Sequence, residues 1–191
     1  MPALGYTYDD HLPADFSAQS LRHDVRTGLT APRKWLPPKW FYDKVGSELF
    51  EDITALREYY PTRTERAILD ESASAIVAAA GVDTLAELGS GSSEKTRLLL
   101  DAMLARTEGR AERREQDPAA DPSASPGATP VPSYVALDVS EDALRAACAA
   151  LVSSYPRLRV GALRADFTHH LELPVIVVDR HGVGSLPLGG P

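Results

Sequence analysis

The chain has 191 residues and a formal net charge of −7, with 27 acidic against 20 basic side chains. This acidic balance, with no basic face to offset it, argues against a nucleic-acid or anionic-membrane surface and favours a small-molecule site. A single cysteine, an N-terminus with early acids and no run of membrane-spanning length predict a cytoplasmic protein without disulfides, signal peptide or membrane segment.

Residues 1–82 have the pattern of a helical segment. One helix is expected near residues 15–27, and "LPPKW" then interrupts the chain because prolines cannot continue a helix. "SELFEDITAL" predicts a second helix from residue 47. Thr62 and Glu65 have the spacing of a capping box, which predicts a third helix that Gly81 would end.

From residue 83 the pattern changes to strands alternating with helices. "TLAEL", "SYVALDV" and "RLRVGAL" predict strands, and "VIVVD" a fourth. Helices are expected in "SSEKTRLLLDAML" and in "SEDALRAACAALV", where Ser140 is a suitable N-cap. The alternation predicts right-handed βαβ units with a parallel sheet, hence an α/β domain over residues 83–178 and an irregular tail over 179–191.

Residues 107–132 interrupt this domain. They are rich in proline, alanine, serine and charge and lack an apolar period. We therefore expect a disordered surface insertion, helical at most in its first turns, rather than an ordered lid.

Cys148 lies in the second of these predicted helices. It shares one helical stripe with Leu144, Ala147 and Leu151. A buried, inert thiol is therefore expected rather than a nucleophile.

The turn "GSGSSEKT", which follows the first predicted strand, is compatible with three kinds of ligand. A dinucleotide fingerprint requires a third glycine at the position of Glu94, and a phosphate loop requires a glycine there, directly before Lys95. A carboxylate at that position would repel phosphates. S-adenosylmethionine carries no phosphate and tolerates Glu94, so it is the ligand that we expect.

Two further segments meet the demands of that cofactor. Asp138 ends the second strand, where a carboxylate can accept hydrogen bonds from both ribose hydroxyls. Asp166 and Phe167 follow the third strand and offer a polar group and a ring face for the adenine. Taken alone, Asp138 or Asp166 is explained as a turn or cap residue, and Lys95 as a solvated helix lysine. Their order along one βαβαβ frame favours the cofactor site.

Three segments carry a family resemblance: "LPPKWFYDKVGSELFEDIT", "REYYPTRTE" and "ELGSGSSEKTRLLLDA". Over residues 24–173 the chain resembles the histidine-specific Nα-methyltransferases, which make hercynine in ergothioneine biosynthesis. The resemblance implies an incomplete, Rossmann-like class I methyltransferase sheet after an N-terminal helical segment. It implies that S-adenosyl-L-methionine is held at Gly89, Lys95, Asp138, Asp166 and Phe167. It also implies that the substrate is met at Tyr59, with Tyr42 as a second aromatic, and it assigns no certain catalytic residue and no metal.

The implied reaction is repeated methyl transfer from a sulfonium to the neutral α-amine of L-histidine, in which positioning dominates. After about residue 173 the family pattern is lost in "VIVVDRHGVGSLPLGGP". We therefore expect a truncated form of such an enzyme. We also expect it to be a monomer with a small-molecule substrate, L-histidine. A cofactor-binding but inactive fragment and a methyltransferase for another small amine remain as alternatives.

Overall fold

The computed structural model describes residues 5–41, 43–91, 93–116 and 131–168. The chain forms two compact units, one of Leu12–Asp70 and one of Met1–His11 with Glu71–Pro191. The second half of helix α3 (Pro61–Ala80) belongs to the second unit, because Ala73 and Val77 are buried and Val77 packs into that unit's core. The two units thus divide within this helix, whereas the sequence predicts a boundary after residue 82.

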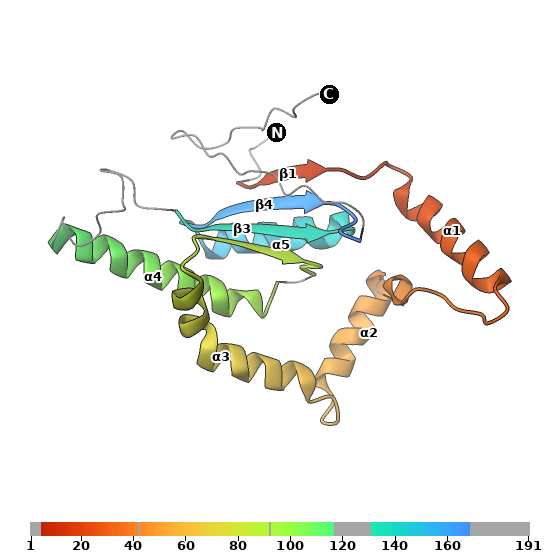
Figure 1. The fold of residues 1–191 in the computed structure, drawn as a ribbon, viewed down its shortest axis with the longest axis horizontal. Helices are drawn as coiled ribbons and strands as arrows, with labels where there is room; N and C mark the ends of the chain where they lie inside the picture. The colour runs from red at the N-terminus through yellow and green to blue at the C-terminus, as the bar shows by residue number, and fades with distance from the viewer. Residues whose placement is uncertain (1–4, 42, 92, 117–130, 169–191) are drawn as a thin grey trace. The chain divides into compact units, whose positions relative to one another are not determined.

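The second unit is built on a sheet of four parallel strands in the order β1-β4-β3-β2 (Figure 1). The strands are β1 (Thr7–Asp10), β2 (Thr84–Leu88), β3 (Ser133–Asp138) and β4 (Arg159–Arg164). Helices α4 (Thr96–Gln116) and α5 (Glu141–Ser154) connect the last three strands. This arrangement confirms the predicted α/β class. Strand β1 was not predicted, since "TYDD" has no apolar alternation and pairs only through its register with β4.

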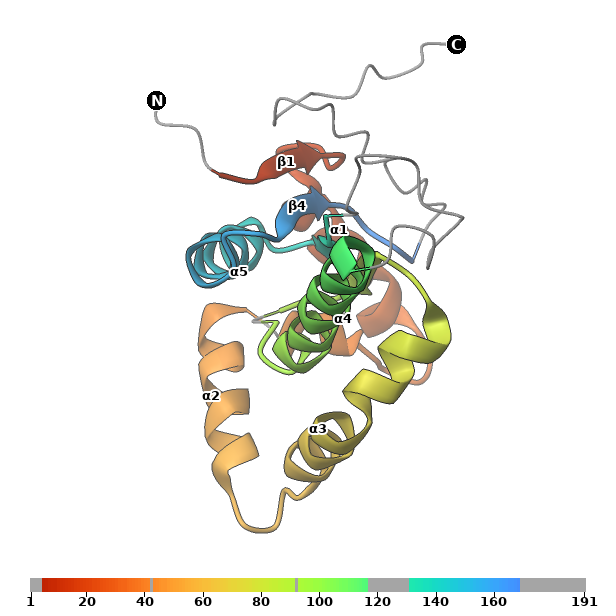
Figure 2. The same cartoon turned by 90° about the vertical axis from the view of Figure 1, so that its left-hand side faces the viewer.

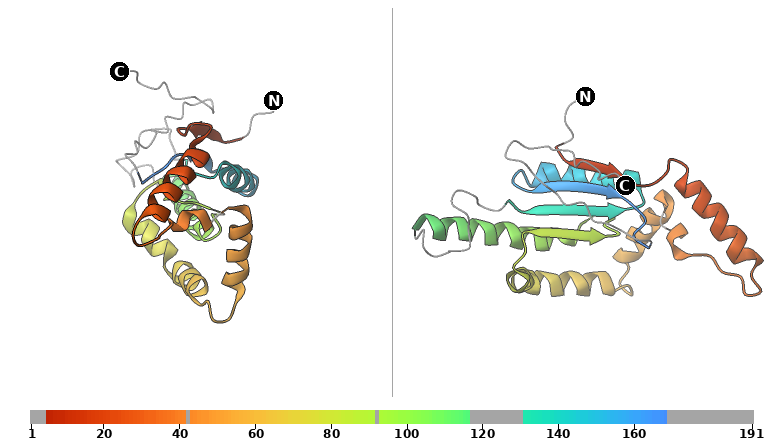
Figure 3. Two further views of the ribbon diagram at one scale, coloured as in Figure 1. Left: turned by 90° about the vertical axis from the view of Figure 1, so that its right-hand side faces the viewer. Right: turned by 45° about the horizontal axis from the view of Figure 1, so that its top comes forward.

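The core of this unit lies between the sheet and its helices. Figures 2 and 3 show α5 running along one face of the sheet beside β4. Side chains of β3 and β4 pack there against the apolar stripes of α4 and α5, as the sequence periodicity predicts. The buried members of this cluster are Val77, Leu100, Met103, Tyr134, Ala136, Leu144, Cys148, Leu151, Leu158, Val160 and Ala162. Val135, Leu137, Leu163 and Ala165 form a second buried cluster.

The two connecting helices differ in how well the sequence predicts them. Ser140 caps α5 as expected, because its Oγ accepts a hydrogen bond from the amide of Ala143 at 3.3 Å. Helix α4, however, extends to Gln116, so the predicted disordered insertion is helical over residues 107–116. The Thr107 hydroxyl donates to the carbonyl of Met103 at 2.9 Å, and Glu108 pairs with Arg157 at 2.7 Å. Residues 117–130 lie outside the described part of the chain.

The other unit is helical, as predicted. It contains α1 (Phe16–Thr30), the short 3-10 helix η1 (Pro38–Phe41), α2 (Lys44–Ala55) and the first half of α3. Asp24 of α1 is 8% exposed and accepts hydrogen bonds from the Trp40 indole and the Lys39 ammonium, both at 2.9 Å. These bonds attach η1 to α1.

Helix α3 begins at Pro61 rather than after Thr62, so Thr62 lies in the first turn and is not the N-cap. Proline is favoured at this position because an amide hydrogen there would have no acceptor within the helix, so its absence costs nothing. Gly81 follows the last helical residue, and its amide donates to the carbonyl of Val77 at 3.1 Å. Among the residues described, no helix has the length and apolar composition needed to cross a bilayer.

Candidate functional site

The segments that the sequence singles out meet at one edge of the sheet. Gly89 follows β2, Asp138 is the last residue of β3, and Asp166 and Phe167 follow β4. The carboxyl ends of parallel strands lie together, and ligands of open α/β sheets bind outside that edge. The structure therefore brings these four residues to one place.

The glycine-rich turn is fixed to the end of β3. The amides of Gly89 and Ser90 both donate to the carbonyl of Leu137, at 2.8 and 3.0 Å. Gly91 adopts a left-handed conformation with φ +49°, and no described atom lies within 4 Å of the position that its Cβ would take. The turn thus leaves space next to its backbone, which a side chain at residue 91 would fill.

The carboxylate of Asp138 faces this turn. Its Oδ2 accepts a hydrogen bond from the amide of Gly91 at 3.2 Å, and its Oδ1 accepts one from the amide of Ser140 at 2.9 Å. A carboxylate oxygen has two lone pairs, so each keeps one acceptor position beyond these bonds. The side chain is partly buried and can accept two further hydrogens at the sheet edge.

A buried arginine lies next to Asp138 in the sheet, but its guanidinium binds another carboxylate. In the strand register Arg164 lies opposite Asp138 of β3 on one side and opposite Asp10 of β1 on the other. Its Nη1 donates to both carboxylate oxygens of Asp10, at 3.2 and 2.9 Å, and its Nε donates to the carbonyl of Val139 at 3.2 Å. Strand β1 therefore supplies the counter-charge for Arg164, whose guanidinium is directed to Asp10 rather than to the carboxylate of Asp138.

Phe167 forms the apolar side of the site. The residue is 39% exposed, and the edge of its ring lies 3.7 Å from the position of a Cβ on Gly89. Asp166 shapes the segment that carries this ring, because its Oδ1 accepts hydrogen bonds from the amide and hydroxyl of Thr168 at 3.0 and 2.6 Å. The amide of Ala165 donates to the carbonyl of Asp138 at 3.1 Å, which joins the ends of β3 and β4.

The structure places the remaining predicted residues less definitely with respect to the glycine-rich turn and Asp138. Lys95 is partly buried just before α4, and its carbonyl accepts the amide of Leu98 at 3.2 Å. Tyr59 belongs to the helical unit, where its ring meets that of Phe50 edge-to-face at a centroid distance of 5.9 Å. Tyr42 lies outside the described residues. Of the two residues predicted to contact the substrate, the structure therefore describes only Tyr59, and only within the helical unit.

Sequence reasoning missed a polar network beneath the glycine-rich turn. Tyr134 donates to Oε2 of Glu87 at 2.6 Å and contacts the Ser93 hydroxyl at 2.7 Å. Thr96 donates to the same oxygen of Glu87 at 2.7 Å. The available signal was a carboxylate in the otherwise apolar strand "TLAEL", since a charge in such a place requires polar partners.

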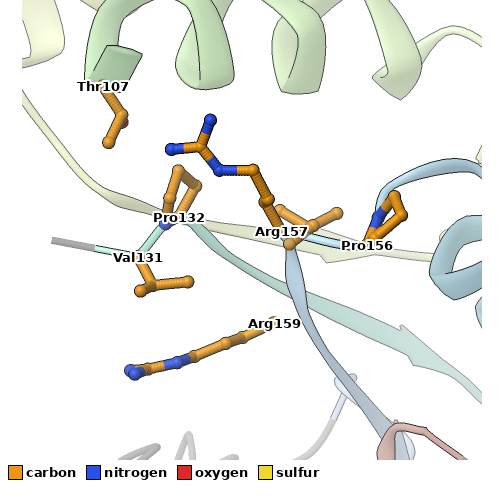
Figure 4. A pocket seen from close by; sticks show the side chains of 7 residues that line it. Thr107, Val131, Pro132, Pro156, Arg157 and Arg159 are labelled. Atoms are coloured by element: carbon orange, nitrogen blue, oxygen red, sulfur yellow. The ribbon is translucent and has the colours of Figure 1, made fainter.

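A separate pocket lies at the opposite edge of the sheet, at the amino ends of β3 and β4 (Figure 4). Figure 4 shows Arg157 extending toward α4 and Arg159 pointing away from it. Arg157 is already paired with Glu108, so the two guanidinium groups do not converge on a common anion. Across the described ranges, no cluster of three or more histidine, cysteine or acidic side chains could hold a metal ion.

Comparison with known proteins identifies a methyltransferase family. The sequence model of a family described as "Histidine-specific methyltransferase, SAM-dependent" matches residues 21–183. The chain is 49% identical over 162 residues to a histidine N-alpha-methyltransferase of Mycolicibacterium smegmatis, covering 85% of this chain and 44% of that protein. It is 43% identical over 166 residues to the protein of the same name from Mycobacterium tuberculosis, covering 86% and 45%.

A more distant relative is named for ergothioneine biosynthesis. Over 91 residues the chain is 37% identical to ergothioneine biosynthesis protein 1 of Schizosaccharomyces pombe, covering 46% of this chain and 11% of that protein. The chain thus spans less than half the length of the curated relatives that it matches.

Proposed function

This chain belongs to the SAM-dependent, histidine-specific methyltransferase family, and on that premise we propose that it serves methyl transfer to the α-amine of L-histidine. The product would be the betaine hercynine, and the partner a small-molecule substrate. The observation that carries this proposal is the meeting of the glycine-rich turn, Asp138 and Phe167 at the carboxyl edge of the sheet.

The residues present fit S-adenosylmethionine. The backbone at Gly91 is open, with no described atom within 4 Å of the place where a Cβ would lie, so a ligand can approach it closely. The two acceptor positions that Asp138 keeps match the two hydroxyls of a ribose. The half-exposed ring of Phe167 offers an apolar face next to Gly89, and Glu94 disfavours phosphate-bearing ligands.

Each residue then has a binding or orienting role. When bound, the cofactor supplies an electrophilic methyl group on a sulfonium. Asp138 would hold the ribose, Asp166 and Phe167 the adenine, and Gly89 with Lys95 the amino-acid end. Tyr59, together with Tyr42, would contact the substrate histidine. Little acid–base catalysis is required once the amine is neutral, so the contribution of these residues is proximity and orientation.

Calorimetry and mass spectrometry together test this function. S-adenosylhomocysteine titrated into the 191-residue chain should bind, whereas ATP and NADH should not, because both carry phosphates at the position that Glu94 disfavours. Histidine and S-adenosylmethionine are then supplied, and mono-, di- and trimethylated histidine are measured. Absence of S-adenosylhomocysteine binding would contradict the cofactor assignment. Binding without any methylated histidine would contradict methyl transfer by this chain and leave a cofactor-binding role.

A further inference from the structure

The polar network beneath the glycine-rich turn has a defined direction of hydrogen bonding. The Glu87 oxygen accepts hydrogens from Tyr134 and Thr96, at 2.6 and 2.7 Å. Because the Tyr134 hydrogen is committed to Glu87, the Ser93 hydroxyl must be the donor in its 2.7 Å contact with Tyr134. The chain of bonds therefore runs from the turn, through Tyr134 on β3, to Glu87 on β2.

Tyr134 is suited to hold this arrangement permanently. Its side chain is fully buried, and burial together with the hydrogen bond to Glu87 raises the pKa of its phenol far above the usual range. The phenol thus stays protonated at neutral pH and well above it. It lies too deep to touch a ligand at the sheet edge, so any effect on binding must pass through the residues it contacts.

Ser93 is the residue on which this network acts. Its backbone adopts φ 54°, a left-handed conformation that is uncommon for a residue with a Cβ. It is 3% exposed, and its amide donates to the carbonyl of Ser90 at 2.9 Å. Such conformations persist where the surroundings hold them, and they cluster at ligand-binding turns. The bond from Ser93 to Tyr134 is one such holding contact.

We propose that Tyr134 is a positioning residue, which through Ser93 fixes the glycine-rich turn in the conformation that receives the cofactor. This inference rests on the proposed function. A turn that is ordered before binding loses less conformational freedom when the ligand arrives, and affinity rises accordingly. Thr96, bonded to the same Glu87 oxygen, fixes the start of α4 at the other end of the turn.

The test compares Tyr134→Phe with a matched control in the 191-residue chain. Tyr8→Phe is that control, because Tyr8 packs against the same core and its buried hydroxyl has no hydrogen-bond partner among the described residues. Ser93→Ala removes the same bond from the other side. Hydrogen exchange of the free chain is followed at the amides of Gly89, Ser90, Gly91 and Ser93, and S-adenosylhomocysteine affinity is measured by calorimetry.

In Tyr134→Phe we expect exchange at these four amides to be roughly two- to tenfold faster and the dissociation constant to rise by a similar factor, the range for one lost hydrogen bond. Ser93→Ala should behave alike, the double variant should add little, and Tyr8→Phe should match wild type. Faster exchange spread evenly over the sheet would show a merely structural role and overturn the proposal, as would unchanged exchange at the turn.

Two outcomes separate this inference from the function on which it rests. If the wild-type chain does not bind S-adenosylhomocysteine, the proposed function fails, and if turn exchange is also unchanged in Tyr134→Phe, the positioning role fails with it. If wild type binds and Tyr134→Phe binds equally well, only the positioning role is overturned. Should Tyr134→Phe lose helicity by circular dichroism, Ser93→Ala decides, because it removes the hydroxyl without leaving a cavity in the sheet.

Discussion

The backbone amide of Gly91 donates a hydrogen bond to Oδ2 of Asp138 at 3.2 Å, joining two segments that are 47 residues apart in the sequence. A carboxylate at the end of β3 thus helps to set the shape of the turn after β2. With the Ser140 bond on its other oxygen, Asp138 orients both loops that border the site. Removal of this side chain should therefore affect the turn as well as the ligand.

Asp138→Ala should weaken binding of S-adenosylhomocysteine by about 1.5–3 kcal/mol, the range for hydrogen bonds to a charged group. Titration calorimetry measures the loss. Asp142→Ala is the control, since Asp142 is exposed in the first turn of the neighbouring helix α5. Equal affinity of the Asp138 variant and wild type would remove Asp138 from the site.

Asp24 should make the helical unit sensitive to acid. The hydrogen bond from Lys39 holds the pKa of the Asp24 carboxyl below its usual range, with burial opposing and the Trp40 bond assisting. A depressed pKa in the folded state means that the stabilisation is present above the unfolded value of about 4 and is lost as pH falls through the folded one. Asp24→Asn should lower the free energy of unfolding by about 1–3 kcal/mol at pH 7.

This difference between Asp24→Asn and wild type should shrink as pH falls below about 4. Denaturant unfolding followed by tryptophan fluorescence measures it, because both tryptophans, Trp35 and Trp40, lie in this unit. Asp52→Asn, at an exposed position of α2, should change the unfolding free energy by less than about 0.5 kcal/mol at any pH. A constant gap down to about pH 2 would show that the charge of Asp24 is not involved.

Cys148 should react with thiol reagents only after unfolding. Burial raises the pKa of its thiol to about 11, and the thiolate is the reactive form. At about pH 8 a disulfide reagent should leave the folded chain unmodified and titrate one thiol in denaturant, since this is the single cysteine. Because the folded pKa is raised, the contribution of Cys148 to stability is complete below about pH 9 and declines toward pH 11. Rapid labelling of the native chain would mean that α5 opens readily.

The sequence predicts those parts of the fold that depend on local periodicity. Strands β2, β3 and β4 and helix α5 with its Ser140 cap follow from apolar patterns and capping chemistry. Strand β1 does not, because its four residues are held by pairing with β4 and by the bond of Asp10 to Arg164, which lies 154 residues away in sequence. Helix α4 exceeds its predicted length: it extends to Gln116 although its last turns have no apolar pattern, and Glu108 in this part pairs with Arg157.

The same division applies to the candidate site. The glycine-rich turn, Asp138 and the Asp166–Phe167 pair follow from strand order, since parallel strands bring their carboxyl ends together. The hydrogen bonds among Glu87, Tyr134 and Ser93 could not be predicted, because they depend on how β2 and β3 are aligned and on the conformation of the turn between β2 and α4. Tyr134 by itself reads as an ordinary core aromatic, and only the register of β2 against β3 places it near Glu87.

Alanine variants of two glycines that share a left-handed backbone conformation can distinguish a ligand site from a structural turn. Gly91 and Gly81 have φ +49° and +67°, so alanine at either position should cost about 1–2 kcal/mol of stability. At Gly81 the new Cβ would meet only the end of Arg106, at 4.0 Å, whereas at Gly91 it would enter open space beside Asp138. Gly91→Ala should therefore also reduce S-adenosylhomocysteine affinity, by tenfold or more if the ligand occupies that space, a loss of about 1.4 kcal/mol. Gly81→Ala should bind as wild type does.

Denaturant unfolding measures the loss of stability in both variants, and calorimetry measures their affinity for S-adenosylhomocysteine. Equal affinities in the two variants would place the cofactor away from the glycine-rich turn.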